Sequence, residues 1–185
     1  MTGRVLIALE DSDEIAEIEL QESRDLDSVE QLLDLAFGPD RRQKTAYRLR
    51  EHVDPLPELS FVVRLGGRLV GTLRFWPVLI KAGEGDETGV PALLLGPIAV
   101  DPALKGRGIG IGLMRHGLER ARALGHRIVI LVGDPEYYRR AGFSQIEPGR
   151  LAMPGPVDVN RLMGLELVPG AMVGVRGRIS QALGS

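Results

Sequence analysis

Glycines at alternate positions mark the segment Lys105–Gly110, which reads Lys-Gly-Arg-Gly-Ile-Gly. Glycine has no side chain to hold a ligand away from the backbone, and it accepts the dihedral angles of a tight turn. An amphipathic stretch follows, so the segment lies where a helix should begin. The first N–H groups of a helix are free and carry the positive end of its dipole. The spacing therefore predicts a site for an anionic group such as a diphosphate.

Two other glycine patterns that bind phosphate do not fit this segment. A dinucleotide fingerprint would need glycine at Ile111 or at Leu113, depending on its register. A nucleoside-triphosphate loop would need Gly-Lys followed by Ser or Thr, and no such ending is present. A nucleotide-binding switch would therefore need selective binding of ATP to support it. The plain alternative is a turn that only lets a helix pack on a strand.

The residues before the glycines predict a buried central strand. Leu93–Val100 is apolar throughout, but Gly96-Pro97 interrupts it, and proline cannot donate a ladder hydrogen bond. The pair predicts a β-bulge with unpaired backbone groups. If the strand splays from its neighbour there, those groups could bind an extended ligand by strand-like hydrogen bonds.

Three linked segments resemble the GNAT superfamily of acyl-CoA-dependent N-acetyltransferases. Ile98–Pro102 is similar to the family strand that pairs with the pantetheine arm. Lys105–Gly110 resembles the pyrophosphate loop, Gln/Arg-x-x-Gly-x-Gly/Ala, and Tyr138–Phe143 resembles the Tyr-x-x-x-Gly-Phe motif. The resemblance covers residues 93–146, and the sequence within this range is similar to the YhbS-like branch of predicted acetyltransferases.

Two features depart from the family pattern. Lysine at 105 keeps a positive charge but gives up the bidentate geometry of arginine. Many members also place an asparagine several residues before the motif tyrosine, whereas this chain has a short Gly133-Asp134-Pro135 link. No asparagine contact to the cosubstrate can therefore be transferred.

The resemblance implies a mixed α/β (α+β) fold, in which helices flank a twisted, mostly antiparallel sheet with splayed central strands. It also implies that an acetyl group passes from acetyl-CoA to a primary amine by direct attack in a ternary complex. The residues that it assigns to the cosubstrate are Ile98, Ala99, Val100, Lys105, Gly106, Arg107, Gly108, Ile109, Gly110 and Ile111. The runner-up function is a non-catalytic acyl-CoA sensor.

Tyr138 is the expected general acid. Its phenol, with a reference pKa of about 10, could protonate or hydrogen-bond the departing thiolate. Adjacent helical residues point about 100° apart, and the motif register favours Tyr138 over Tyr137, whose ring we expect to pack in the core. The base stays open between a water relay and the carboxylates of Glu84, Asp86, Glu87, Asp101 and Asp134.

Composition argues against several other kinds of function. The chain has 185 residues, which suits one domain over 1–185 with a C-terminal strand or cap at 157–185. Its net charge of -2 gives no reason to propose nucleic acid or an acidic membrane as partner. Absence of cysteine excludes disulfides and thiolate nucleophiles. His52, His116 and His126 show no metal-site spacing, so no metal is expected. Apolar runs are too short to cross a bilayer, and we expect a cytoplasmic protein.

Periodicity predicts the elements that position the motifs. We expect strands at 15–21, at 127–132 and at 162–168, and a hairpin over 61–77 that turns at Gly66-Gly67. Helices are expected after Asp25, which can cap the first one, over 42–52, from Gly108 and from Pro135. The segment 171–185 could finish the sheet or pair with a second copy in a homodimer.

The acceptor is a small-molecule or peptide amine whose identity the sequence leaves open. Basic residues gather on or near the second expected helix, namely Arg41, Arg42, Lys44, Arg48 and Arg50. A solvated polar face is the plain explanation of this cluster. If the cluster lines the acceptor entrance, it favours acceptors that carry a carboxylate or a phosphate.

Overall fold

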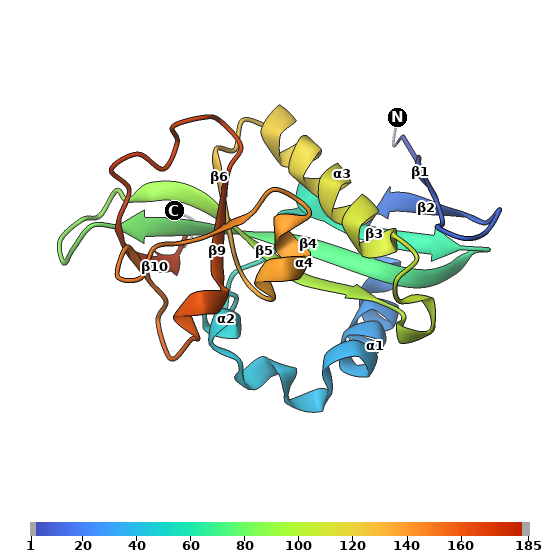
Figure 1. Ribbon diagram of the computed structural model, residues 1–185. Helices are drawn as coiled ribbons and strands as arrows, with labels where there is room; N and C mark the ends of the chain where they lie inside the picture. The colour runs from blue at the N-terminus through green and yellow to red at the C-terminus, as the bar shows by residue number, and fades with distance from the viewer. Residues whose placement is uncertain (1–2, 183–185) are drawn as a thin grey trace.

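The computed structural model describes residues 3–182, and this part of the chain contains ten strands and four α-helices (Figure 1). The strands are β1 (Val5–Ala8), β2 (Ile15–Leu20), β3 (Ser60–Leu65), β4 (Arg68–Lys81), β5 (Val90–Val100), β6 (Ile128–Val132), β7 (Ser144–Gln145), β8 (Leu151–Ala152), β9 (Leu162–Glu166) and β10 (Gly177–Gln181). The helices are α1 (Leu26–Phe37), α2 (Thr45–Arg48), α3 (Ile109–Ala123) and α4 (Pro135–Arg139). None of these described helices is long and apolar enough to cross a membrane.

All ten strands belong to one sheet. Its order is β1-β2-β3-β4-β5-β6-β9-β7, with β10 beside β4 and β8 beside β10. Only the β5–β6 and β8–β10 pairs are parallel, and every other pair is antiparallel. The predicted mixed, mostly antiparallel fold is therefore confirmed.

Alternation of side chains along the strands decides which helix covers which face. Phe61 and Val63 of β3 lie in the main core with the buried face of α3, whereas Val62 lies in a smaller cluster with α1. The predicted apolar face of α3 is confirmed, since Met114 and Leu118 are buried. Figure 1 shows α3 and α1 on opposite sides of the sheet.

Two glycine signals behave as predicted. Gly66 and Gly67 have φ values of 57° and 83° and join β3 to β4, as a tight hairpin turn requires. On β5, Leu73 of β4 pairs with Ile98 while Phe75 pairs with Leu95, so two β5 residues lie opposite one β4 residue. This is the bulge expected at Gly96-Pro97.

The bulge coincides with the parting of β5 from β6. These strands pair only at Leu93 with Val129 and at Leu94 with Ile130. Beyond that point β6 continues to pair with β9, through Leu131 and Met163, but no longer with β5. The edge of β5 from Leu95 onward therefore has no strand beside it on the β6 side.

One strand was missed in the sequence, and two expectations need correction. Strand β1 was not predicted, because Val5–Ala8 carries no alternation of its own and is held by β2. The carboxylate of Asp25 does not cap α1: it accepts a hydrogen bond from the Glu22 N–H (2.9 Å) and pairs with Arg64. The helix expected over 42–52 is only the single turn of α2, since Lys44 before it is extended.

The C-terminal segment completes the chain's own sheet. β10 runs antiparallel to β4, with Ile179 opposite Ile80. Residues 183–185 of the expected segment lie outside the described part of the chain. The strand expected over 162–168 is present as β9, and the one over 127–132 as β6.

The contact between α3 and β4 depends on a missing side chain, and it generates a first prediction. A Cβ at Gly117 would lie 2.8 Å from the Phe75 ring and 3.0 Å from a Leu73 methyl. Alanine is the better helix former by about 1 kcal/mol. We nevertheless expect Gly117→Ala to lower the free energy of unfolding by about 1–3 kcal/mol, because the buried ring cannot yield. Urea denaturation measures the change.

The exposed Arg115 of the same helix provides the control. Arg115→Ala should alter the free energy of unfolding by no more than about 0.5 kcal/mol. A Gly117→Ala chain as stable as the parent would show that α3 does not rest on β4 in this way.

Candidate active site

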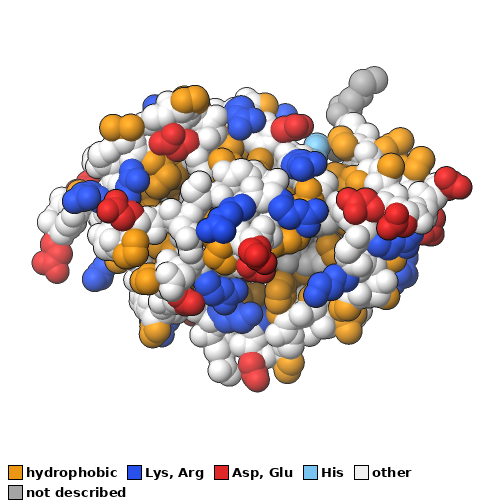
Figure 2. Space-filling model, viewed as in Figure 1, with side chains coloured by type: hydrophobic (Ala, Val, Ile, Leu, Met, Phe, Trp, Pro, Cys, Tyr) orange, Lys and Arg blue, Asp and Glu red, His pale blue; other side chains and the backbone are white. Residues whose placement is uncertain are grey.

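A cavity of about 410 Å³ lies where β5 ends, α3 begins and α4 passes beside them. The surface between α4 and α1 is visibly hollowed in Figure 2, with hydrophobic side chains at the bottom and Lys and Arg on both sides. Residues expected at the site that line this cavity are Ile98, Ala99, Val100, Lys105, Gly106, Gly108, Ile109, Gly110, Ile111 and Tyr138. The fold thus gathers the three motifs around one space.

The glycine-rich turn forms an open cradle at one end of the cavity. Gly106 and Gly108 have φ values of 80° and 84°, which L side chains rarely adopt. The first main-chain bond of α3 runs from the Gly112 N–H to the Gly108 carbonyl (3.0 Å). The amides of the preceding helical residues have no partner within the helix, and the helix dipole adds to their positive potential. This geometry suits an anion.

Arg107 is the expected residue whose side chain does not face the cavity. Its guanidinium donates to Ser12 Oγ (2.6 Å) and to Glu14 Oε2 (2.8 Å). Its carbonyl accepts a hydrogen bond from the Glu10 N–H (3.0 Å). Arg107 therefore ties the cradle to the β1–β2 connection and leaves Lys105 as the cationic side chain of the turn that lines the cavity.

The β1–β2 connection also brings a carboxylate to the cradle. Glu10 lines the cavity, and its Oε1 lies 3.1 Å from where a Cβ on Gly108 would be. A side chain 98 positions away in sequence carries no local signal of this role. The other lining residues that sequence reasoning missed are Ala36, Phe37, Pro102, Leu104, Tyr137 and Arg140.

Both tyrosines of α4 reach the cavity. The Tyr137 hydroxyl lies directly over Gly110, in space that any side chain at 110 would fill. The Tyr138 ring covers Gly133 and meets the buried Phe143 edge to face, with centroids 6.1 Å apart. The expectation that Tyr137 only packs in the core was therefore incomplete, because its hydroxyl reaches the cradle.

Burial raises the pKa of Tyr138 to about 12, and its neighbours Tyr137 and Asp134 push in the same direction. The positive charges of Arg161 and Arg50 oppose this shift. The phenol is accordingly protonated at neutral pH and available as a hydrogen-bond donor. This state is the one that a general acid needs.

The five carboxylates named as candidate bases do not line this cavity. Asp101 accepts from the Ala103 N–H and pairs with Arg68, and Asp134 accepts from the Glu136 N–H at the start of α4. The other three, Glu84, Asp86 and Glu87, lie in the β4–β5 turn, at the opposite end of β5. The base is therefore unassigned.

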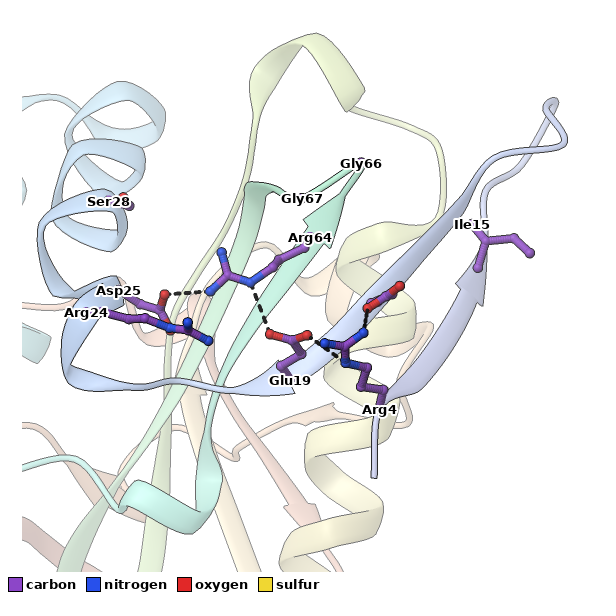
Figure 3. A pocket seen from close by; sticks show the side chains of 10 residues that line it. Arg4, Ile15, Glu19, Arg24, Asp25, Ser28, Arg64, Gly66 and Gly67 are labelled. Atoms are coloured by element: carbon purple, nitrogen blue, oxygen red, sulfur yellow. Dashed lines mark hydrogen bonds and ion pairs between the residues drawn. The ribbon is translucent and has the colours of Figure 1, made fainter. Parts of the chain in front are cut away.

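A second hollow, lined by residues of β2 and β3 and of the start of α1, contains ion pairs (Figure 3). Glu19 links Arg4 (3.2 Å) to Arg64 (3.0 Å), and Arg64 continues to Asp25 (2.5 Å). Because each of these charges has a partner, we interpret the network as a structural one that links β1, β2, β3 and the start of α1.

Known proteins are similar to this chain in both sequence and fold. The family profile described as an acetyltransferase (GNAT) domain matches residues 17–146. The uncharacterised N-acetyltransferase YjhQ of Escherichia coli K12 is 30% identical over 141 residues, which are 76% of this chain and 75% of that protein. YhbS of the same strain is 28% identical over 156 residues, or 84% and 89% of the two chains.

Two solved structures of similar proteins contain a bound ligand. The crystal structure of Escherichia coli YhbS in complex with CoA has a TM-score of 0.77 and 26% identity, covering 92% of each chain. A GNAT acetyltransferase from Brucella melitensis, in complex with acetyl-CoA, has a TM-score of 0.63 and 26% identity, covering 89% of this chain and 94% of that one.

The buried state of Tyr138 makes a second prediction. An unfolded phenol ionises near pH 10, whereas the folded Tyr138 keeps its proton until about 12. Its contribution to stability is therefore complete below pH 10 and is lost as the pH rises toward 12. In a stopped-flow jump to pH 11, we expect about nine-tenths of the Tyr138 ionisation to occur in the slow phase that accompanies unfolding, read as tyrosinate absorbance near 295 nm.

Tyr138→Phe should remove most of one tyrosine of amplitude from the slow phase and only about a tenth of one from the fast phase. Loss of amplitude from the fast phase instead would mean that the phenol is open to solvent and that its pKa is ordinary.

Proposed function

We propose that this chain, which belongs to the GNAT acetyltransferase family, transfers an acetyl group from acetyl-CoA to a primary amine by direct attack in a ternary complex. One observation carries the proposal. An anion cradle at the start of α3 is continuous with a β5 edge that has no partner strand. The CoA and acetyl-CoA held by the two solved relatives support the choice of cosubstrate.

The cradle would hold the diphosphate of the cosubstrate. The main-chain amides at 109–111 lie in the first turn of α3, after the positive φ of Gly108, and residues 109–111 line the cavity. Lys105 and Arg140, which also line the cavity, supply positive charge. A carboxylate at Glu10 reduces this potential, so the amides carry the larger share of the binding.

The free edge of β5 would hold the pantetheine arm. Backbone groups at 98–100 lie on a strand without a neighbour on the β6 side and can pair with the amides of an extended ligand. The arm would then run from the cradle toward the bulge at Gly96, and its thioester would reach the region of Tyr138. Fixed placement of the two reactants lowers the barrier by proximity.

The chemistry needs one bond formed and one broken. The neutral amine nitrogen attacks the thioester carbonyl, a backbone N–H of β5 stabilises the oxygen as it becomes negative, and the C–S bond then breaks. Tyr138, the proposed acid, gives its proton to the leaving thiolate, and the proton lost by the amine returns through water to the phenolate. Water is the proposed acceptor of the amine proton.

The single-domain organisation over 1–185, a homodimer and a cytoplasmic location stay predictions of the sequence. Peptide and small-molecule amines are both within the proposal, since the arrangement of the cradle and β5 concerns only the acyl donor.

Release of CoA thiol tests the function directly. We expect acetyl-CoA to yield free thiol only when a suitable amine is present, with the N-acetyl product seen by mass spectrometry. Small amines, aminoglycosides and peptides with free N-termini form the panel. Stoichiometric binding of acetyl-CoA without thiol release from any amine would favour the non-catalytic sensor, and an absence of binding would remove both functions.

Removal of the Tyr138 hydroxyl tests the proposed acid. We expect Tyr138→Phe to lower kcat by roughly a hundredfold or more, because the thiolate then leaves without a donor. Affinity for CoA, measured by calorimetry, should be unchanged, since the ring still packs on Phe143.

Tyr137→Phe is the matched control. Its hydroxyl lies over Gly110 at the cradle, so this variant should change CoA affinity and leave kcat nearly intact. Equal kcat values for the parent and Tyr138→Phe would end the assignment of Tyr138 as acid.

A further inference from the structure

Arg50 holds its guanidinium against two aromatic rings. The Arg50 Cζ lies 4.7 Å from the centroid of the Tyr47 ring and 5.7 Å from that of Trp76. Both distances are within the range of cation–π contacts, which stabilise the charge of the guanidinium without supplying acceptors for its N–H groups.

The positive charge of Arg50 has no counter-ion. Within residues 3–182, Arg50 makes no ion pair, its Nε is buried without a partner, and the neutral hydroxyl of Tyr47 is the one side-chain group that interacts with its guanidinium by hydrogen bonding. Buried polar groups are almost always satisfied, so such an atom calls for a ligand or a function. Burial lowers the pKa of Arg50 to about 10, and the group stays charged at neutral pH.

The carboxylates near Arg50 form ion pairs with neighbouring arginines. Glu30 of α1 accepts from Arg41 and from Arg74 Nη1 (3.3 Å), and Asp34 accepts from Arg41 Nε (2.8 Å). Burial opposes the ionised form of Glu30, but its hydrogen bonds from arginine keep its pKa below the usual value. Arg41, Arg42 and Arg74 thus share these two carboxylates, and Arg50 is left without one.

Arg50 lies at the bulge of β5, beyond the end of the proposed pantetheine site. Its Nη2 is 3.0 Å from where a Cβ on Gly96 would be, and the carbonyl of Gly96 is held by Trp76 Nε1 (2.6 Å). The charge of Arg50 is also close enough to lower the pKa of Tyr138. Arg50 therefore stands beside the place where the thioester and the acceptor amine would meet.

We propose that the free edge of the Arg50 guanidinium binds a carboxylate of the acceptor, so that the substrate of this enzyme is an amine that also carries a carboxylate. The inference rests on the proposed acetyl transfer. A planar carboxylate matches two parallel N–H donors in one plane. The aromatic rings of Tyr47 and Trp76 lie next to the guanidinium and favour a flat group over a tetrahedral phosphate.

Binding can be measured without catalysis, because Trp76 is the only tryptophan of the chain. Its fluorescence should change saturably when glycine, β-alanine or γ-aminobutyrate is added to the enzyme with CoA, at constant ionic strength. The corresponding carboxamides should produce no such change. Arg50→Met, which keeps an unbranched apolar chain but removes the charge, should abolish the response, whereas Arg115→Met on the exposed face of α3 should preserve it.

Thermal unfolding separates a binding role from a structural one. Loss of a partly buried cation without a counter-ion should leave Tm unchanged or raise it, since that charge has no compensating carboxylate in the described part of the chain. A fall in Tm for Arg50→Met, together with equal fluorescence responses to carboxylates and carboxamides, would overturn the proposal.

Kinetics supply the second arm. With the best acceptor of the series, Arg50→Lys should raise KM by about tenfold or more, because lysine loses the bidentate contact, while kcat changes by less than about twofold. The matched carboxamide should show the same KM with both enzymes. Stronger binding of aminoalkyl phosphonates than of carboxylates would refute the planar site.

The two proposals fail in different ways. If no amine releases thiol from acetyl-CoA but the Trp76 response to carboxylates depends on Arg50, the transfer fails and the anion site stands. If thiol is released equally from carboxylate and carboxamide amines, and Arg50→Lys leaves KM unchanged, the transfer stands and the carboxylate site is wrong.

Discussion

The parting of β5 from β6 after Leu94 is the constraint on which the rest of the site depends. A continuous parallel pair would satisfy the backbone of β5 and leave no room for an extended ligand. The bulge at Gly96-Pro97 interrupts that pairing, and the β6 strand follows β9 instead. A strand edge thereby becomes a binding surface, with the cradle of α3 at one end and Arg50 at the other. A backbone ladder would lose hydrogen bonds here if no ligand replaced them.

Local signals explain how much of this could be predicted. Gly106 and Gly108 have positive φ, which predicts a tight turn at this point. Gly96-Pro97 predicts the bulge in β5, and Gly66-Gly67 predicts the hairpin between β3 and β4. The expected cosubstrate residues line the cavity, apart from the side chain of Arg107, because strand, turn and helix are consecutive in sequence.

The missed features come from segments far apart in the chain. Glu10 reaches the cradle through the β1–β2 connection, and Arg50 reaches the bulge from the residues after α2. The sequence shows a basic cluster but cannot show that Arg41 is paired with Glu30 and Asp34 while Arg50 is not. Likewise, Asp25 has the right residue type for a helix cap, yet Arg64 across the sheet engages its carboxylate. In each case a distant partner decides the role.

The charged and polar groups of the proposed site are arranged in sequence along the cavity and the β5 edge. Amides and a helix dipole attract the diphosphate, the neutral phenol of Tyr138 stands between, and the cation of Arg50 lies beyond it. Tyr138 is already protonated at neutral pH, because burial raises its pKa to about 12 and the opposing charge of Arg50 is a smaller effect. A carboxylate bound at Arg50 would therefore place the acceptor amine beside an acid that carries its proton. An unpaired cation is costly to bury, and a role of this kind is a physical reason for the chain to hold one beside its acid.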